Sequence, residues 1–511
     1  TGKEMLGLDT PDSGIGTVAY APTGKLLASA SMKTIWIWDV VTTKLVHKLD
    51  GHEGSVSAMV FSGNGKFLAS ASHDGTFRLW NTDSGKEQRR VKASNGYYSH
   101  LALSPDGTKL AWNSDDEPGI ISLWDVSMGK ESRRLAVRPE QPGVRPMISS
   151  LSFSADGINL VASSGTHVVL LGWNVATGKE LSLPGKHDGG LNWVAFSPDG
   201  RSMATATMDG SVFLRETATG QARLIVKDAG YTTTLAFSPD ARFLALGNNG
   251  SHSHVTSDKK LVQSGFENRN QVRLLDLSNG KVIHTFSGHI GPIDALAFSP
   301  DGKTLSSGSR DATVLIWDVA AYVRDTAMPG RQLLATDLDT MWSDLDGDVS
   351  KAYRSIITLA AAPAQALTLL KDRLHPVVAA NPKHVSSLLK QLDSDRFPDR
   401  EKAMAELKKM ADAAEPALQQ ALSSNPSPES QRRLEQLHAA LDVTKPGSER
   451  LRTWRALEIL ERVADAEAME LLRRLAAGDP QAWLTKEAKA SLKRLDRISR
   501  TTGSRFPSQG R

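Results

Sequence analysis

The chain has 511 residues, 40% of them hydrophobic, and a formal net charge of +4 at pH 7. This length allows two or more domains that each bury their own hydrophobic core. The sequence contains no cysteine, which excludes disulfides, thiol catalysis and zinc–thiolate sites, and no apolar run in it is long enough to span a membrane.

Residues 1–320 repeat one pattern seven times. An apolar strand leads to a polar turn such as Ser-Pro-Asp-Gly at residues 197–200, a second strand follows, and a third strand ends in Trp-Asp or a remnant of it. A unit of four short alternating strands and about forty residues is typical of a β-propeller blade, because a single blade cannot bury its apolar face alone. We therefore predict a multidomain chain, with an all-β seven-bladed propeller over residues 1–322 followed by an all-α region.

The motifs within the repeats follow a fixed order. Gly-His precedes the first strand, Phe-Ser-Pro-Asp-Gly ends it, and Ser-x-Asp and Trp-Asp come later. This order resembles the WD40-repeat family of the bacterial type. The resemblance implies that the His, a strand Ser or Thr, the turn Asp and the Trp form one buried hydrogen-bond chain per blade. Carried onto this sequence, the implied chains comprise His52, Ser72, Asp74 and Trp80 in the second blade, His187, Thr207 and Asp209 in the fifth, and His289, Ser309, Asp311 and Trp317 in the seventh.

The residues themselves support a structural role for these chains. A buried Asp or His costs free energy unless it is paired, and a complete chain fixes the turn that carries it. An Asp–His pair could also be catalytic, but this pair recurs with the same spacing in three blades, whereas an enzyme needs one site. The fifth blade has Arg215 in place of the Trp. The first and fourth blades lack the turn Asp, so we expect them to be less tightly held.

The N-terminal residues are predicted to close the ring. Residues 1–6 match the opening of a fourth strand at residues 177–181, whereas no fourth strand follows Trp317. We predict that the N-terminal strand completes the seventh blade, which removes open sheet edges. A first residue of Thr also predicts that the chain is a fragment or a processed product.

Helical patterning begins around Pro329, where Ala, Leu, Glu, Lys and Arg replace Gly, Ser and Thr. We predict a linker over residues 323–346, helices over 347–497 and a basic disordered tail over 498–511. Proline residues and the predicted N-caps Asp395 and Ser427 divide the helical part. The predicted helices lie near residues 348–361, 363–373, 382–392, 397–412, 415–423, 428–441, 449–464, 466–476 and 483–496.

Residues 392–441 resemble HEAT-type helical repeats, similar to the helical regions appended to bacterial WD40-repeat proteins. A plain helical bundle is the alternative. The C-terminal helix and tail are rich in Lys and Arg, but Phe506 is the one aromatic residue among them. A solvated basic face is therefore favoured over nucleic-acid binding.

The motifs predict no metal and no cofactor. An acidic stretch at residues 344–348 hints at a calcium loop, but Val349 and Ser355 stand where such a loop requires Gly and Glu. These acids fit the N-terminus of a helix better. His252 and His254 have no third ligand nearby in the sequence.

The candidate binding surface is one rim of the propeller. Partner binding on WD40-type propellers commonly uses the turns before the first strand and between the second and third strands, and the resemblance implies the same here. Tyr, Trp, Met and Arg carry binding energy when a partner desolvates them, although several of these side chains could instead pack between blades. The candidate rim residues are His73, Tyr97, Tyr98, Asn192, Trp193, Met208, Tyr231, Asp294 and Arg310.

These observations predict a non-enzymatic scaffold that binds protein or peptide partners on the propeller rim and the helical surface. The alternative is a regulatory or sensor module of a larger enzyme, for example a protein kinase, with its catalytic domain upstream of Thr1. A propeller hydrolase or oxidoreductase would need a lone cluster of acids or metal ligands, which the sequence lacks. The expected location is the cytoplasm, and the N-terminus leaves a periplasmic or exported location open. The partner and the oligomeric state are not predicted.

Overall fold

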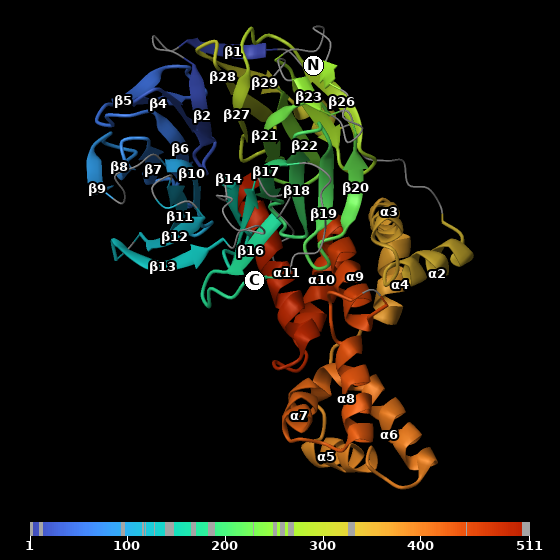
Figure 1. The fold of residues 1–511 in the computed structure, drawn as a ribbon. Coiled ribbons are helices and arrows are strands. Elements are labelled where there is room, and N and C mark those ends of the chain that lie inside the picture. Colours follow the sequence, from blue (N-terminus) through green and yellow to red (C-terminus); the bar gives the residue numbers. More distant parts are fainter. Residues whose placement is uncertain are drawn as a thin grey trace, which may run out of the picture. The chain divides into compact units, whose positions relative to one another are not determined.

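The computed structural model describes residues 4–9, 14–92, 98–114, 117, 119–126, 128–137, 148–164, 170–181, 190–227, 229–248, 253–255, 261–263, 270–324, 333–445 and 447–502. The chain forms two compact units that divide between residues 326 and 327, and each unit is described by itself. The first unit is built almost entirely of strands and the second of helices (Figure 1).

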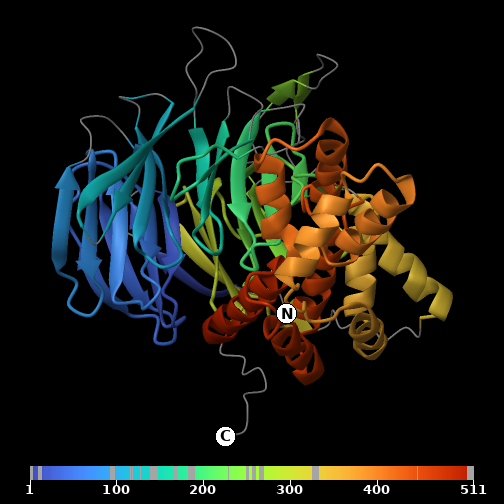
Figure 2. The same cartoon turned by 90° about the horizontal axis from the view of Figure 1, so that it is seen from below.

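Seven antiparallel sheets make up the first unit (Figures 1 and 2). The innermost strand of each sheet contacts the innermost strands on both sides, and β27 contacts β2, so the sheets form a closed ring of seven blades, as predicted. In chain order the blades are β2 (Ile15–Tyr20), β3 (Leu26–Ser31), β4 (Thr34–Asp39) and β5 (Leu45–Leu49); β6 (Val56–Phe61), β7 (Phe67–Ser72), β8 (Thr76–Asn81) and β9 (Glu87–Lys92); β10 (Tyr98–Leu103), β11 (Lys109–Ser114), β12 (Ile120–Asp125) and β13 (Lys130–Ala136); β14 (Ile148–Phe153), β15 (Asn159–Ser164) and β16 (Leu170–Asn174); β17 (Leu191–Phe196), β18 (Ser202–Thr207), β19 (Val212–Glu216) and β20 (Ala222–Val226); β21 (Thr232–Phe237), β22 (Phe243–Asn248), β25 (Val272–Asp276) and β26 (Lys281–Phe286); and β27 (Ile293–Phe298), β28 (Thr304–Ser309), β29 (Thr313–Asp318) and β1 (Glu4–Asp9). A small hairpin of β23 (Ser253–Val255) and β24 (Leu261–Gln263) lies between β22 and β25 along the chain, and α1 (Ala320–Arg324) follows β29.

The N-terminal strand completes the seventh blade. Strand β1 pairs antiparallel with β29, with Glu4 opposite Trp317, and the predicted closure of the ring is confirmed. Side chains also join the first and seventh blades. Tyr20 OH lies 3.2 Å from Thr304 Oγ1 and accepts a hydrogen bond from Ser306 Oγ at 2.7 Å. The seam of the ring is therefore held by a backbone ladder and by side-chain hydrogen bonds.

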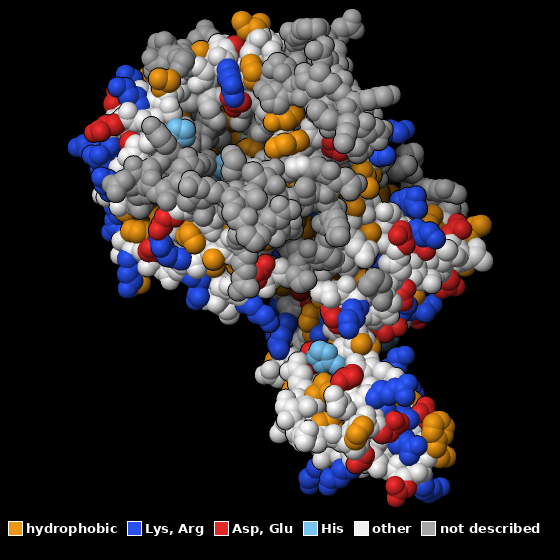
Figure 3. All heavy atoms as spheres, viewed as in Figure 1, with side chains coloured by type: hydrophobic (Ala, Val, Ile, Leu, Met, Phe, Trp, Pro, Cys, Tyr) orange, Lys and Arg blue, Asp and Glu red, His pale blue; other side chains and the backbone are white. Residues whose placement is uncertain are grey.

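Long side chains on the outermost strands link neighbouring blades at the circumference. His47 on β5, Arg89 on β9 and Arg133 on β13 each reach a backbone carbonyl in the turn after the third strand of the next blade, at 3.1, 3.1 and 2.9 Å. Figure 3 shows Lys and Arg side chains along this margin of the ring. At Gly129, with a φ of +63°, a Cβ would lie 2.7 Å from Arg89 Nη1. Glycine is therefore required there both for its backbone conformation and for the side chain above it.

The second unit contains ten helices among its described residues. The predicted helices correspond to α3 through α11, with shifts at their ends. The helices are α2 (Ala335–Asp344), α3 (Val349–Ala360), α4 (Pro363–Arg373), α5 (Pro382–Gln391), α6 (Phe397–Lys409), α7 (Ala411–Ser423), α8 (Pro428–Ala440), α9 (Glu449–Val463), α10 (Ala466–Ala476) and α11 (Trp483–Thr502).

Two predicted boundaries differ from the structure. The linker predicted over residues 323–346 contains α2, because its acidic residues conceal an apolar stripe of Leu338, Met341 and Leu345 at helical spacing. The tail predicted to be disordered begins with residues 498–502, which belong to α11. The rest of that tail lies outside the described residues.

The predicted helix starts are partly confirmed. Ser427 caps α8 by accepting a hydrogen bond from a backbone N–H of its first turn at 3.2 Å. Asp348 caps α3 by accepting from two backbone N–H groups at 3.1 and 2.9 Å. The prediction for Asp395 was wrong, because α6 begins one residue later, with Arg396 at the capping position.

The helical unit has two separate hydrophobic cores. One core joins α2, α3 and α4 to α9, α10 and α11, and the other is confined to α5–α8 and its flanking residues. Helix α9 contacts both α3 and α4, so the α5–α8 bundle is inserted between the two halves of the first core. In a HEAT-type stack each repeat contacts its neighbours alone. This topology therefore favours the helical-bundle alternative.

Carboxylates of α7, above all Asp412, connect the inserted bundle to the other core. Asp412 in α7 accepts hydrogen bonds from the backbone N–H groups of Trp483 and Leu484, at 3.1 and 3.0 Å, at the start of α11. It also pairs with Arg450 of α9 at 2.9 Å, and Arg450 reaches Glu415 at 2.9 Å. Arg450 is 9% exposed, so this ion pair is shielded from water and joins three helices.

Asp412→Ala is expected to loosen this junction and to lower the free energy of unfolding by about 1–3 kcal/mol, because it removes the acceptor for two backbone donors. Hydrogen–deuterium exchange should be faster at the amides of Trp483 and Leu484. The matched control is Asp442→Ala, since Asp442 hydrogen-bonds within its own turn, to Thr444. Unchanged exchange at the start of α11 in Asp412→Ala would argue against this role.

Candidate functional site

Buried polar residues in the second blade form a continuous hydrogen-bond chain. Trp80 Nε1 donates to Ser70 Oγ at 2.8 Å, and Ser70 Oγ lies 2.8 Å from His52 Nε2. His52 Nδ1 lies 2.9 Å from Asp74 Oδ2, and the Thr76 hydroxyl donates to Asp74 at 2.6 Å. A neutral His52 with its hydrogen on Nδ1 satisfies every one of these groups, because Ser70 then donates to His52 and accepts from Trp80.

The serine in this chain is Ser70 and not the predicted Ser72. Trp80 lies opposite Leu68 in the sheet, so its indole reaches the residue two positions further along β7. Ser72 lies at the far end of that strand and donates to Gly54 O at 2.8 Å. Ser72 therefore fixes the turn before the inner strand and does not link the Trp to the His.

The seventh blade repeats this arrangement, with Ser307 in place of the predicted Ser309. Trp317 Nε1 donates to Ser307 Oγ at 2.8 Å, and Ser307 Oγ lies 2.7 Å from His289 Nε2. His289 Nδ1 lies 3.0 Å from Asp311 Oδ2. In both blades the linking serine is the fourth residue of the second strand. This position, two residues before the Ser of Ser-x-Asp, is the signal that the sequence prediction missed.

The fourth residue of the second strand also shows why other blades lack the chain. In the first blade this residue is Ser29, and Trp38 Nε1 donates to it at 2.9 Å although the turn has no Asp. In the third, fourth and sixth blades it is Trp112, Ala162 and Leu246. None of these three side chains can accept from an indole and also donate to a His. That the first and fourth blades are less tightly held stays a prediction.

An aromatic cluster takes the place of the chain in the third blade. Trp124 packs against Trp112 and Phe77, with ring centroids 5.7 and 5.4 Å apart. Trp124 Nε1 is buried and has no hydrogen-bond partner among the described residues. Packing of aromatic rings therefore replaces hydrogen bonding here.

The fifth blade retains part of the predicted chain. Thr207 donates to Asp209 at 2.5 Å. Arg215, which stands at the Trp position, is buried and donates to the carbonyl of Gly220 at 3.0 Å. The predicted partner His187 lies outside the described residues.

Burial and hydrogen bonding set the charges of the His–Asp pair. Desolvation by burial lowers the pKa of His52 below its usual value, and the hydrogen bond to Asp74 offsets this in part. Burial alone would raise the pKa of Asp74, but hydrogen bonds from Thr76, the Glu53 amide and His52 lower it to about 2. At neutral pH the chain therefore contains a neutral His and an ionised Asp, as its hydrogen bonds require.

Trp80→Phe is expected to lower the free energy of unfolding by about 1–3 kcal/mol, because it removes the donor to Ser70 at a buried site. Trp124→Phe is the matched control, since it makes the same change where the indole N–H has no partner among the described residues. We expect a smaller loss there. Urea unfolding followed by circular dichroism compares the two variants, and equal losses would show that the chain adds nothing to packing.

The shift at His52 predicts that the melting temperature falls as the pH drops below about 6.5. The unfolded chain takes up a proton near the ordinary His pKa of about 6.5, whereas burial keeps folded His52 neutral to lower pH. The unfolded state then binds more protons, so acid favours it. Asp74 affects a different pH range. It stabilises the folded state above about pH 4, and this stabilisation is lost as the pH falls toward about 2.

The melting temperature of His52→Gln should therefore fall less than that of the unchanged protein when the pH is lowered from about 7.5 to about 5.5. Differential scanning calorimetry at a series of pH values measures this. The comparison uses the change with pH alone, so a lower melting temperature of the variant at neutral pH does not affect it. Identical pH dependence in the two proteins would refute the assignment.

The starts of the inner strands and the turns between second and third strands lie on one face of the ring, which we call the entrance rim. Antiparallel pairing places them together, as where Ile293 lies opposite Ser309 in the seventh blade. Every inner strand has a β-bulge at its second residue. These bulge residues are all small or polar, namely Gly16, Ser57, Ser99, Ser149, Asn192, Thr233 and Asp294.

Four of the predicted rim residues are accessible or charged. Arg310 and Asp294 come together on the entrance rim, where Arg310 Nε donates to Asp294 Oδ2 at 2.7 Å. The side chain of Arg310 is 63% exposed, and this hydrogen bond raises the pKa of its guanidinium. His73 is exposed in the equivalent turn of the second blade, and Met208 is 39% exposed in that of the fifth.

The other predicted rim residues are less available to a partner. Asn192 Nδ2 donates to a backbone carbonyl at the start of β21 at 3.4 Å, so it joins two blades. Trp193 and Tyr231 are half-buried. Tyr97 lies outside the described residues, and for Tyr98 the structure describes the backbone in β10 alone.

Two exposed apolar side chains on the same rim were not predicted. Met32 is 55% exposed and Ile290 is 88% exposed. Met32 occupies the turn of the first blade, at the position that Arg310 has in the seventh, and its φ of +47° is uncommon for a residue other than glycine. Ile290 directly follows the Gly-His motif of the seventh blade. The missing Asp of the first blade was the signal that could have drawn attention to Met32.

Metal chemistry finds no support in the described part of the chain, where no three His, Asp or Glu side chains lie close enough to hold an ion. The acidic stretch before α3 is used in other ways. Asp344 accepts a hydrogen bond from Ser355 Oγ at 2.9 Å, and Asp346 pairs with Arg452. His252 lies outside the described residues. Within those residues, each helix is too short or too polar to cross a bilayer.

Comparisons with known proteins agree with this architecture. Residues 2–39, 43–81, 178–215 and 280–318 match the family model described as WD domain, G-beta repeat. Guanine nucleotide-binding protein subunit beta of Oryza sativa subsp. japonica is 26% identical over 323 residues, covering 59% of this chain and 80% of that protein. WD repeat-containing protein WDS homolog of Arabidopsis thaliana is 25% identical over 312 residues, covering 55% of this chain and 58% of that protein. Nuclear distribution protein nudF of Aspergillus niger is 23% identical over 324 residues, covering 62% and 70%.

The four matched segments all lie in the propeller, so the first unit carries WD40 repeats. The relatives named here are eukaryotic proteins and do not confirm the bacterial type of the predicted resemblance. The HEAT-like interpretation of residues 392–441 receives no support from the matched segments.

Proposed function

We propose that this protein is a non-enzymatic scaffold that binds peptide or protein segments on the entrance rim of its propeller. One observation carries the proposal: three exposed apolar side chains, Met32, Met208 and Ile290, lie on the same rim as the exposed Arg310. Single exposed apolar residues are ordinary on protein surfaces. Several of them on one rim, together with an exposed charged residue, are typical of a binding surface.

The chemistry of Arg310 indicates the kind of segment that fits. Asp294 accepts from Nε and holds the side chain in place. The two terminal nitrogens of Arg310 donate to no described residue, so they are available for a carboxylate of a partner. An acidic side chain flanked by apolar ones would pair with Arg310 and cover Ile290 and Met32. The closed ring keeps these groups in position, so little entropy is lost on binding.

The helical unit supplies the second proposed surface. Helices α6 and α8 contain most of residues 392–441, the segment with the HEAT-like pattern, and each has an exposed face. The alternative of a regulatory or sensor module of a larger enzyme rests on residues beyond the chain, and no observation on the described residues favours it.

The test is capture from native cell extract with the whole chain as bait, followed by quantitative mass spectrometry. Arg310→Ala and Ile290→Ser should each reduce the retained partner about tenfold or more, the effect expected for residues central to an interface. Lys86→Ala and Met128→Ser are matched controls, because both residues are exposed and lie in turns between a third and a fourth strand, away from the entrance rim.

The outcomes separate the candidate surfaces. A partner that the controls retain and the rim variants release supports the proposal. A partner retained equally by all four variants places binding elsewhere, with the helical unit next to be tested. Recovery of nucleic acid that is released at high salt would instead identify a basic surface as the functional one.

A further inference from the structure

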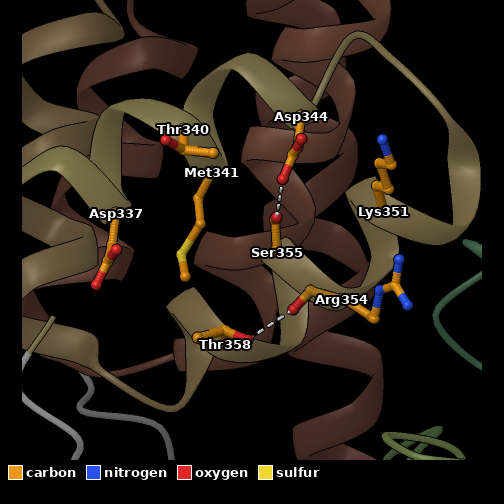
Figure 4. A pocket seen from close by; sticks show the side chains of 8 residues that line it. All are labelled: Asp337, Thr340, Met341, Asp344, Lys351, Arg354, Ser355 and Thr358. Carbon is orange, nitrogen blue, oxygen red and sulfur yellow. Dashed lines mark hydrogen bonds between the residues drawn. The ribbon is translucent and has the colours of Figure 1, made fainter.

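A pocket of about 450 Å³ lies between α2 and α3 (Figure 4). The two helices contribute to it with the same spacing, since each places four residues at positions i, i+3, i+4 and i+7 along one face. Helix α2 contributes Asp337, Thr340, Met341 and Asp344, and α3 contributes Lys351, Arg354, Ser355 and Thr358.

Opposite charges occupy opposite ends of this pocket. Figure 4 shows the carboxylate of Asp337 at one end and Lys351 and Arg354 at the other. Lys351 and Arg354 are exposed, and neither forms an ion pair within the part of the chain that the structure describes. Between the two ends, Ser355 Oγ donates to Asp344 at 2.9 Å. The pocket thus has the carboxylate of Asp337 at one end. At the other end it has two cations with no ion pair among the described residues.

We propose that this pocket is a self-association surface that binds the same pocket of a second copy of the chain. A surface with an acidic end and a basic end is complementary to itself under a twofold rotation. With the axis through the middle of the pocket, Asp337 of each copy meets Lys351 and Arg354 of the other. Each charged contact then occurs twice, as in every isologous interface.

The centre of the pocket also suits two copies of one surface. Met341 is partly buried against the core of its own unit and lies between the charged ends. Under the same rotation the two Met341 side chains meet each other, and the flexible thioether adapts to such a contact. The hydroxyls of Thr340 and Thr358 donate to carbonyls of their own helices, so neither hydroxyl needs a partner from the second copy.

A small anion fits this pocket less well than a second copy. A phosphate could pair with Lys351 and Arg354, but it would leave the carboxylate of Asp337 at the other end without a cation. A second copy brings charges of both signs in the required order. This inference is independent of binding at the entrance rim, but a dimer would present two rims at once and raise the avidity for a repeated partner.

The experiment is sedimentation velocity of the whole chain over a range of concentrations and salt. The unchanged protein should dimerise up to about 100 μM, and added salt should weaken the dimer by screening the exposed charges. Asp337→Lys makes both ends of the pocket basic, and the double variant Lys351→Glu with Arg354→Glu makes both ends acidic. Each of these two variants alone should associate about tenfold or more weakly, because its ends repel their counterparts.

Charge exchange makes the test specific. A mixture of the basic and acidic variants should form a heterodimer, and a chain that carries all three substitutions should dimerise again, since both arrangements restore complementarity. Lys390→Glu with Lys402→Glu is the matched control for the acidic double variant. Both residues are exposed on α5 and α6, outside the pocket, and the net charge changes by the same amount as in Lys351→Glu with Arg354→Glu. This control should dimerise like the unchanged protein. Equal thermal melting of all variants verifies that they fold.

Three results would overturn the proposal. The unchanged protein could remain a monomer over the whole concentration range. The dimer could persist unweakened in both single-sign variants. The mixture of the basic and acidic variants could fail to associate.

Discussion

Closure of the ring is the constraint on which the first unit depends. Strand β1 pairs with β29 across more than three hundred residues of sequence, with Glu4 opposite Trp317. Without that pairing the seventh blade would expose a strand edge, and every inner strand would lose its fixed place beside its neighbours. Tyr20, which bridges to Thr304 and Ser306, adds buried hydrogen bonds at the same seam, and burial raises the pKa of its phenol.

Buried hydrogen bonds from an indole to a serine occur in the blades at and next to that seam. An indole N–H donates to a serine in three consecutive blades, to Ser307 in the seventh, Ser29 in the first and Ser70 in the second, and the first blade has this bond without the rest of the chain. Directional hydrogen bonds thus fix the register of the blades at and next to the closure. The exposed Ile290 and Met32 lie in turns of the same blades. The part of the rim with the most accessible apolar side chains is therefore carried by the blades with the most specific internal hydrogen bonding.

The ring could be predicted from the sequence because each blade repeats the same local pattern. A blade whose own motif is incomplete is therefore still recognised from the spacing of the other six. The linking serine could not be predicted, because Ser70 and Ser72 lie on the same face of one strand and only the pairing of Leu68 with Trp80 decides between them. Helix α2 was missed because its carboxylates suggested a loop. The inserted α5–α8 bundle could not be predicted, because helical spacing shows which face is apolar but not which helices meet.

The two units use charge in different ways. In the propeller, carboxylates such as Asp74 are buried and satisfied within one blade, so they define the fold and leave little for a partner. In the helical unit, Asp412 joins two bundles, whereas Lys351 and Arg354 remain exposed with no ion pair among the described residues. A charge that stabilises its own domain is buried and paired, and a charge that serves recognition is held in place but left open. Arg310, fixed through Nε with no described partner for its other nitrogens, has the second arrangement, as the proposed rim site requires.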